Sequence, residues 1–139
     1  MKENKRYNST MIFSLAIYAS PSTQASDSAY RFAQSVLAQG HELYRVFFYH
    51  DGAYQGSDLL TPPQGEVHST KRWQLLADEY KLDLVVCIAA GLRRGILDEK
   101  EAGRYEKSTH NMATGFELSG LGQLVDAAVH SDRIITFGY

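Results

Sequence analysis

The chain has 139 residues, of which 44% are hydrophobic, which is enough for one globular domain with its own core but leaves little room for a second. Its 14 basic and 16 acidic residues nearly balance, so it lacks the basic excess typical of proteins that bind nucleic acids directly. A single cysteine excludes an internal disulfide, and no apolar run approaches the roughly 20 residues of a membrane span. We therefore predict a cytoplasmic protein that contacts neither membrane nor nucleic acid.

The chain begins with a polar stretch, residues 1–10, that lacks the apolar segment of a signal peptide. We predict that this stretch is a flexible extension and that a single domain spans residues 11–139. The first apolar run, Ile12–Ala19, predicts a strand buried in a sheet.

The next element is expected to be a helix that runs to about Gln39, because apolar residues recur at helical spacing up to that point. Ser26 or Asp27 is the expected N-cap, since both side chains accept hydrogen bonds from the free amides of a first helical turn. A second strand is predicted at His41–Tyr49. The polar stretch from there to about Gly65 is long for a loop in a small domain, which favours a binding role or some helix of its own.

Similar patterns predict the remaining elements. In chain order they are a helix at Ser69–Tyr80, a strand at Leu84–Ala89, a short charged helix at Asp98–Tyr105, a short strand at Phe116–Leu118, a helix that follows Gly122 and ends near His130, and a strand at Arg133–Phe137. Strands that alternate with helices imply a mainly parallel sheet covered on both faces. We predict an α/β fold of three layers, α/β/α, around a sheet of four to five strands.

The third predicted strand carries the only cysteine, Cys87, near its carboxyl end. Ligands and chemistry gather beyond the carboxyl ends of strands in open α/β sheets, which makes this thiol the first candidate for a site. On the residues alone, a cysteine between Val86 and Ile88 is more often an inert core residue. A reactive thiol requires exposure and nearby cations or helix amides.

Two arginines, Arg93 and Arg94, follow close enough in sequence for a turn to bring a guanidinium back to the thiol. Free amides after Gly91, at the start of a helical turn, would favour an anion there as well. Alternatively, the two arginines are a solvated pair that balances the charge of Asp98 and Glu99.

The histidines offer a possible base for Cys87, as in cysteine hydrolases. His50, at a strand end, is the histidine expected to lie nearest to Cys87. For each of the five histidines, a solvated or structural role is nevertheless more common than a catalytic one; they are His41, His50, His68, His110 and His130. No residues show the spacing of metal ligands, so no metal is predicted. The glycines at 120 and 122 lack the full dinucleotide fingerprint, and close packing of helix on strand is their expected use; no cofactor is predicted.

Aromatic residues are abundant, with nine tyrosines and six phenylalanines, several of them at Phe47, Phe48, Tyr49 and Tyr54. An aromatic surface is typical of protein interfaces, which favours an oligomer, whereas ordinary core packing is the alternative.

Several segments together resemble the TusD-like sulfurtransferase subunits of the DsrE family. They are Phe32-Ala33-Gln34, Gly40-His41-Glu42-Leu43, Val46-Phe47-Phe48-Tyr49, Cys87 with Leu92-Arg93-Arg94-Gly95, Glu101-Ala102-Gly103-Arg104, and the run from Gly115 to Gly122. The resemblance extends from about Met11 to Phe137 and implies a DsrEFH-like fold. It also implies that Cys87 carries sulfur as a persulfide, without a cofactor or a metal.

The resemblance further implies partners. Such subunits assemble with TusB-like and TusC-like chains into a heterohexamer of two heterotrimers, accept sulfur from a TusA-like donor and pass it on with a TusE-like acceptor, toward 2-thiouridine at the tRNA wobble position. From the chemistry, Arg93 and Arg94 are expected to stabilise the anionic sulfur. The alternatives are a DsrE-type subunit of sulfur oxidation, a non-catalytic scaffold of an oligomer, and a cysteine hydrolase with a histidine beside Cys87.

Overall fold

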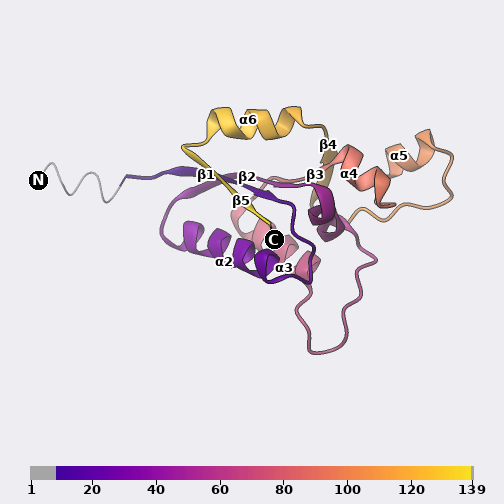
Figure 1. The fold of residues 1–139 in the computed structure, drawn as a ribbon, viewed down its shortest axis with the longest axis horizontal. Coiled ribbons are helices and arrows are strands. Elements are labelled where there is room, and N and C mark those ends of the chain that lie inside the picture. Colours follow the sequence, from indigo (N-terminus) through magenta and orange to yellow (C-terminus); the bar gives the residue numbers. More distant parts are fainter. Residues whose placement is uncertain (1–8, 139) are drawn as a thin grey trace, which may run out of the picture.

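Five parallel strands form one sheet in the order β4-β3-β2-β1-β5 in this structure, a computed structural model that describes residues 9–138 (Figure 1). The strands are β1 (Ile12–Ile17), β2 (Glu42–Phe48), β3 (Leu84–Cys87), β4 (Phe116–Ser119) and β5 (Arg133–Phe137). Every adjacent pair is parallel. The predicted α/β class is therefore confirmed, and the five strands lie within the predicted count of four to five. The predicted extension at residues 1–10 falls mostly on residues 1–8, which lie outside the described residues, and it stays a prediction.

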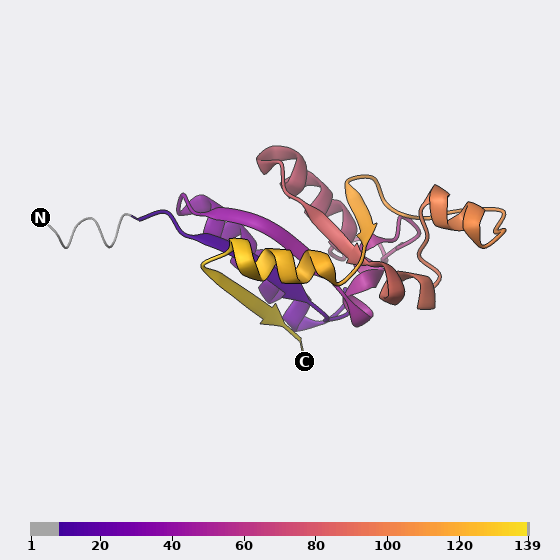
Figure 2. The same ribbon diagram turned by 90° about the horizontal axis from the view of Figure 1, so that it is seen from above.

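Helices cover both faces of the sheet. In Figures 1 and 2, α2 (Gln24–Ala38) and α3 (Ser69–Tyr80) lie on one face and α6 (Gly122–His130) lies on the other, which confirms the three layers. Three short helices gather at one end of the sheet: the 3₁₀ helix η1 (His50–Gly56), α4 (Ile88–Arg93) and α5 (Glu99–Arg104). Because η1 directly follows β2 and α4 directly follows β3, that end is where the strands terminate.

The core lies between the helices and the central strands. Phe47 and Phe48 on β2 are fully buried, and the Phe48 ring meets the Trp73 ring of α3 edge to face at 5.5 Å. The interpretation of this aromatic cluster as an interface is therefore wrong for both phenylalanines: β2 is a central strand, so its side chains are covered on either face. Tyr49 is half-buried, and of the four residues in this cluster only Tyr54 is exposed.

Several predicted boundaries hold and others shift. The bounds of α3 and β5 agree with the prediction. The N-cap of α2 is Thr23, whose hydroxyl accepts from the Ser26 amide at 3.2 Å, so the predicted caps Ser26 and Asp27 are wrong. Both lie inside the helix, where Ser26 is buried and Asp27 pairs with arginines. The predicted loop after β2 does contain helix, namely η1.

The expected use of Gly120 and Gly122 is wrong. A Cβ added at Gly120 or Gly122 would meet no atom within 4 Å, so neither position serves close packing of helix on strand. The close approach occurs at Gly52 instead, where a Cβ would lie 2.1 Å from the carbonyl oxygen of Ile17. Only glycine therefore lets η1 lie against the end of β1.

Candidate active site

Cys87 lines an open pocket at the carboxyl end of the sheet. Cys87 is the last residue of β3 and the N-cap residue of α4, and it is 6% exposed. The pocket has a volume of about 700 Å³ and is lined by Tyr18, Tyr49, His50, Cys87, Ala89, Ala90, Arg93, Arg94 and Leu121. The thiol is therefore recessed, but it is not sealed beneath the core.

The pocket is built where four parallel strands end. Tyr18 follows β1, Tyr49 and His50 follow β2, Cys87 ends β3, and Leu121 lies just beyond β4. Parallel strands bring their carboxyl ends to one edge, so residues far apart in sequence meet there. The structure thus places Cys87, Arg93 and Arg94, the three residues singled out from the sequence, around one pocket.

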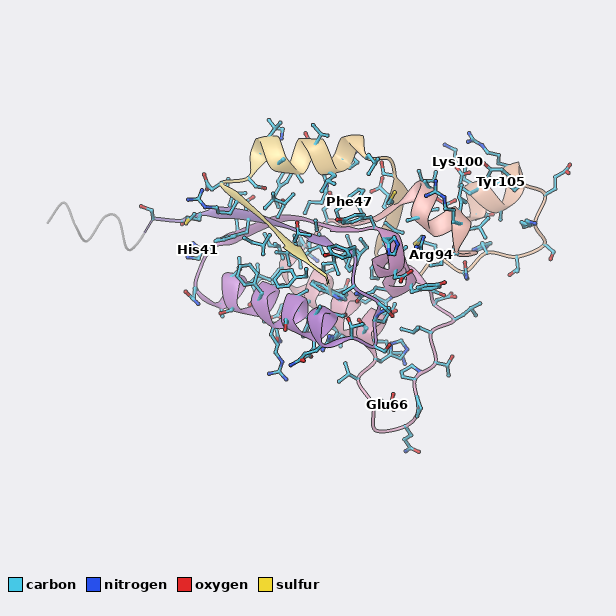
Figure 3. All side chains as sticks on the ribbon, in the orientation of Figure 1. His41, Phe47, Glu66, Arg94, Lys100 and Tyr105 are labelled. Atoms are coloured by element: carbon cyan, nitrogen blue, oxygen red, sulfur yellow. The ribbon has the colours of Figure 1, made fainter. Side chains whose placement is uncertain are left out.

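Arg94 is held in a defined position. Its Nε and Nη2 both lie 3.1 Å from Oδ1 of Asp51, and its Nη1 donates to the Ala90 carbonyl at 3.1 Å. The side chain is 15% exposed, so it is not the solvated partner of Asp98 and Glu99. Asp98 instead caps α5 by accepting from the Glu101 amide at 2.8 Å. Figure 3 shows Arg94 where η1 and α4 meet.

Arg93 is exposed, lines the same pocket and forms no ion pair among residues 9–138. Gly91 does not open the helical turn that we expected after it, because α4 already begins at Ile88 and contains Gly91. A Cβ at Gly91 would lie 3.1 Å from Cδ2 of Leu118 and 3.2 Å from the Ile96 carbonyl oxygen. This glycine lets α4 pack against β4, which fixes the helix that follows the thiol.

His50 is the histidine that the structure brings to the pocket of Cys87. Its backbone adopts the left-handed conformation, with φ of 51°, and its Nδ1 lies 3.8 Å from Oδ2 of Asp51. The other four lie elsewhere: His41 accepts from the Met11 amide, His68 caps α3, His110 is exposed after α5, and His130 bonds the Asp126 carbonyl. Figure 3 places His41 at the opposite end of the sheet from Arg94.

Two tyrosines complete the pocket wall. The rings of Tyr18 and Tyr49 lie 5.6 Å apart. Burial raises the pKa of the Tyr49 phenol, and the neighbouring Tyr18 raises it further. Tyr49 therefore stays uncharged at neutral pH and adds no negative charge to oppose the arginines.

Sequence reasoning missed Asp51, Tyr18 and Tyr49 as parts of the site. One signal points to them: each lies within a few residues of the end of a predicted parallel strand, as Cys87 does. Within the described part of the chain, no group of three or more His, Cys, Asp or Glu side chains is arranged to hold a metal ion. Among residues 9–138, none of the helices combines the length and apolar character needed to cross a bilayer.

Comparison with known proteins gives a family and several relatives. Residues 11–137 match the model of the DsrE/DsrF-like family. A protein of Allochromatium vinosum with the name "Putative sulfurtransferase DsrE" is 54% identical over 129 residues, which cover 92% of this chain and 99% of that protein. The Sulfurtransferase TusD of Photorhabdus laumondii is 44% identical over 115 residues, or 83% of this chain and 88% of its own.

The fold also has a solved counterpart. The crystal structure of the ychN protein from E. coli superposes with a TM-score of 0.67 at 18% identity, covering 93% of this chain and all of that one. At this identity the likeness concerns the fold alone.

Proposed function

The chain belongs to the DsrE/DsrF-like family, and we propose that it is a sulfurtransferase subunit that carries sulfur as a persulfide on Cys87. Relatives at 44% and 54% identity over most of the chain are named sulfurtransferases, in agreement with a transferase. The observation that carries the residue assignment is that Cys87, the only cysteine of the protein, lines a pocket that Arg93 and Arg94 also line.

The proposed reaction needs one thiol on this chain. The Cys87 thiolate attacks the outer sulfur of a donor persulfide, R–S–SH; the bond from Cys87 to that sulfur forms, the donor S–S bond breaks, and the donor leaves as a thiolate that takes up a proton. An acceptor thiolate then attacks the outer sulfur of Cys87–S–SH and releases Cys87. Each step is an exchange between thiolate and persulfide, so no external oxidant or reductant is consumed.

The two arginines are assigned different parts in this reaction. Arg94 is fixed by Asp51 and by the Ala90 carbonyl, so its charge is a constant part of the pocket. Arg93 is exposed and is available to an anionic sulfur that enters from solvent. The thiolate is the reactive form in the exchange, and the guanidinium at the pocket wall is the group that an anionic sulfur would meet there.

We place the subunit in a relay that accepts sulfur from a TusA-like donor and passes it, with a TusE-like acceptor, toward 2-thiouridine at the tRNA wobble position. In this proposal it works beside TusB-like and TusC-like subunits in a heterohexamer in the cytoplasm. The names of the TusD relatives support the placement.

A second pathway is supported by a different relative. The protein of Allochromatium vinosum that is 54% identical carries the name DsrE, which favours a DsrE-type subunit of sulfur oxidation. Deleting the gene separates the two: loss of 2-thiouridine from tRNA supports the first pathway, and loss of growth on reduced sulfur compounds with normal tRNA supports the second.

Intact-mass spectrometry after incubation with a persulfide donor tests sulfur transfer itself. Wild-type protein should gain the mass of one sulfur atom, reversibly on reduction, and Cys87→Ser should gain none. Arg93→Gln should still load, but more slowly. Absence of the adduct from the protein and from its complex with copurifying partners would contradict the proposal and favour a scaffold. Turnover of an ester or amide that depends on Cys87 would instead favour a hydrolase.

A further inference from the structure

His50 lies in the Cys87 pocket in a backbone conformation that most residues avoid. Its φ of 51° is left-handed, and residues other than glycine adopt this region infrequently. A conformation of this kind persists where the surroundings over-determine it, and it is often found at functional sites. His50 is therefore a candidate for a role in the pocket that it lines.

The surroundings of His50 do hold it in place. On one side, the Tyr49 amide donates to the Ile17 carbonyl at 3.0 Å and continues the edge of the sheet. On the other, Gly52 lies against the same carbonyl, and its amide donates to the Tyr49 carbonyl at 3.0 Å. His50 is thus fixed between two anchored residues, although its own side chain is about half exposed toward the pocket.

A carboxylate and a guanidinium stand behind the imidazole. Oδ2 of Asp51 lies 3.8 Å from Nδ1 of His50, while Oδ1 of Asp51 is held by Arg94. An acidic group on the Nδ1 side of a histidine favours the ring that carries a proton there, which leaves Nε2 as the acceptor. The series Arg94, Asp51, His50 therefore places a carboxylate, itself held by a guanidinium, beside an imidazole at the rim of the pocket that Cys87 lines.

We propose that His50 accepts the proton of the Cys87 thiol when sulfur is received, and that Asp51 is the positioning residue for its ring. This inference rests on the proposed sulfurtransferase function and adds the proton path. Nε2 takes the thiol proton, directly or through one water; the thiolate then attacks the outer sulfur, and the departing donor thiolate takes the proton back from the imidazolium. The sum of the steps is Cys87–SH plus R–S–SH giving Cys87–S–SH plus R–SH.

The other charged and titratable groups around the pocket are not suited to accept the proton of the Cys87 thiol. The guanidinium groups of Arg93 and Arg94, at the end of α4, are hydrogen-bond donors without an acceptor, so neither takes up the thiol proton. The pKa of Tyr49, beyond β2, is raised by burial and by Tyr18, beyond β1, so its phenol stays protonated at neutral pH. Asp51 is occupied by Arg94. Histidine is the side-chain type that ordinarily exchanges a proton between pH 5 and 8.

The test is single-turnover sulfur loading of Cys87 from a small-molecule persulfide, measured by rapid quench and intact mass over a pH series. The informative variant is His50→Asn, because asparagine tolerates the left-handed backbone but has no titrating ring. The matched control is His110→Asn, an exposed histidine outside the pocket. General base catalysis ordinarily contributes about 10²–10⁴-fold, so we expect His50→Asn to load about 100-fold more slowly near neutral pH, and the control to load normally.

Four further readouts distinguish proton transfer from a structural role. The slow loading of His50→Asn should be partly restored by imidazole in the buffer, and its deficit should shrink as pH rises and hydroxide replaces the base. Asp51→Asn should lose less rate than His50→Asn while showing an altered pH profile. Thermal unfolding of each variant should match wild type within a few degrees.

The outcomes separate the two proposals. If wild-type protein and its assembled complex take up no sulfur at any pH, the sulfur-carrying function is overturned and the proton path with it. If wild type loads and His50→Asn loads at the same rate with the same pH profile, the role of His50 alone is overturned. A folded His50→Asn that is slow at every pH and insensitive to imidazole also overturns it, since that behaviour indicates altered pocket shape.

Discussion

Replacing Gln55 with methionine should destabilise the protein strongly, because this fully buried side chain joins three elements behind the active site. Its carbonyl oxygen accepts from the Trp73 indole N–H at 3.1 Å and from the Ser69 hydroxyl, and its amide nitrogen donates to the Ser26 hydroxyl at 3.0 Å. Gln55 belongs to η1, Ser26 to α2, and Ser69 and Trp73 to α3. The network therefore fixes the helix that carries His50.

The expected cost follows from what each partner loses. Methionine has a similar length but no hydrogen-bonding groups, so the Trp73 N–H, whose hydrogen cannot rotate, is left buried and unpaired at about 1–3 kcal/mol. The two serine hydroxyls rotate to new partners, and each lost bond costs about 0.5–1.5 kcal/mol. The free energy of unfolding should thus fall by roughly 2–6 kcal/mol, a large part of the roughly 5–15 kcal/mol of a typical domain.

Urea denaturation measures this change directly, since Trp73 is the only tryptophan and its fluorescence reports on the site of the substitution. Far-UV circular dichroism on the same samples checks that unfolding is a single transition. The control is Gln64→Met, an exposed glutamine, which should change the free energy by less than about 0.5 kcal/mol. A loss below about 1 kcal/mol in Gln55→Met, with an unchanged urea slope, would refute the reasoning.

Two further predictions concern packing and pH. Gly91→Ala should destabilise by about 1–3 kcal/mol in the same assay, because the new Cβ would press on Leu118 and on the Ile96 carbonyl. Gly103→Ala, in α5 with no atom within 4 Å, should stabilise by about 0.5–1 kcal/mol, and equal effects at the two glycines would contradict the packing argument. Hydrogen bonds from Tyr44 and then Arg45 lower the pKa of Asp126. The stability that this carboxylate contributes is present above an ordinary aspartate pKa of about 3.9 and is lost as pH falls through the lowered value. Asp126→Asn should therefore flatten the acid limb of stability against pH, and an unchanged limb would show that the contact between β2 and α6 contributes nothing.

Periodicity predicts well those helices and strands whose bounds depend on the residues within them. The bounds of α3 follow from the apolar spacing that leads to Trp73 and Leu76, both buried in the core. The β-branched run before Cys87 predicts its place near the end of a parallel strand, and the parallel sheet then brings it to the edge where ligands bind. This much of the site depends on local pattern and on a general rule of α/β sheets.

The rest depends on contacts between distant segments. Arg94 pairs with Asp51, 43 residues earlier, rather than with the nearby Asp98 and Glu99, and only the register of β2 beside β3 brings the two together. The strand with Cys87 ends two residues earlier than predicted because α4 starts at once, which Gly91 permits by packing against Leu118. Neither the pairing of Arg94 with Asp51 nor the early end of β3 can be predicted from the residues next to it in the sequence.

The depth of Cys87 has a chemical consequence for a relay. A persulfide is consumed by any thiol that reaches its outer sulfur, so a fully exposed carrier would lose its sulfur to small thiols in solution. A fully buried carrier would exchange with nothing. At 6% exposure, in a pocket that Arg93 and Arg94 also line, Cys87 admits a reaction partner that enters the pocket while most of the thiol stays shielded. A substitution that opens this wall, such as Leu121→Ala, should therefore speed the reductive loss of sulfur from Cys87 more than it speeds loading, and equal acceleration of both would argue against shielding.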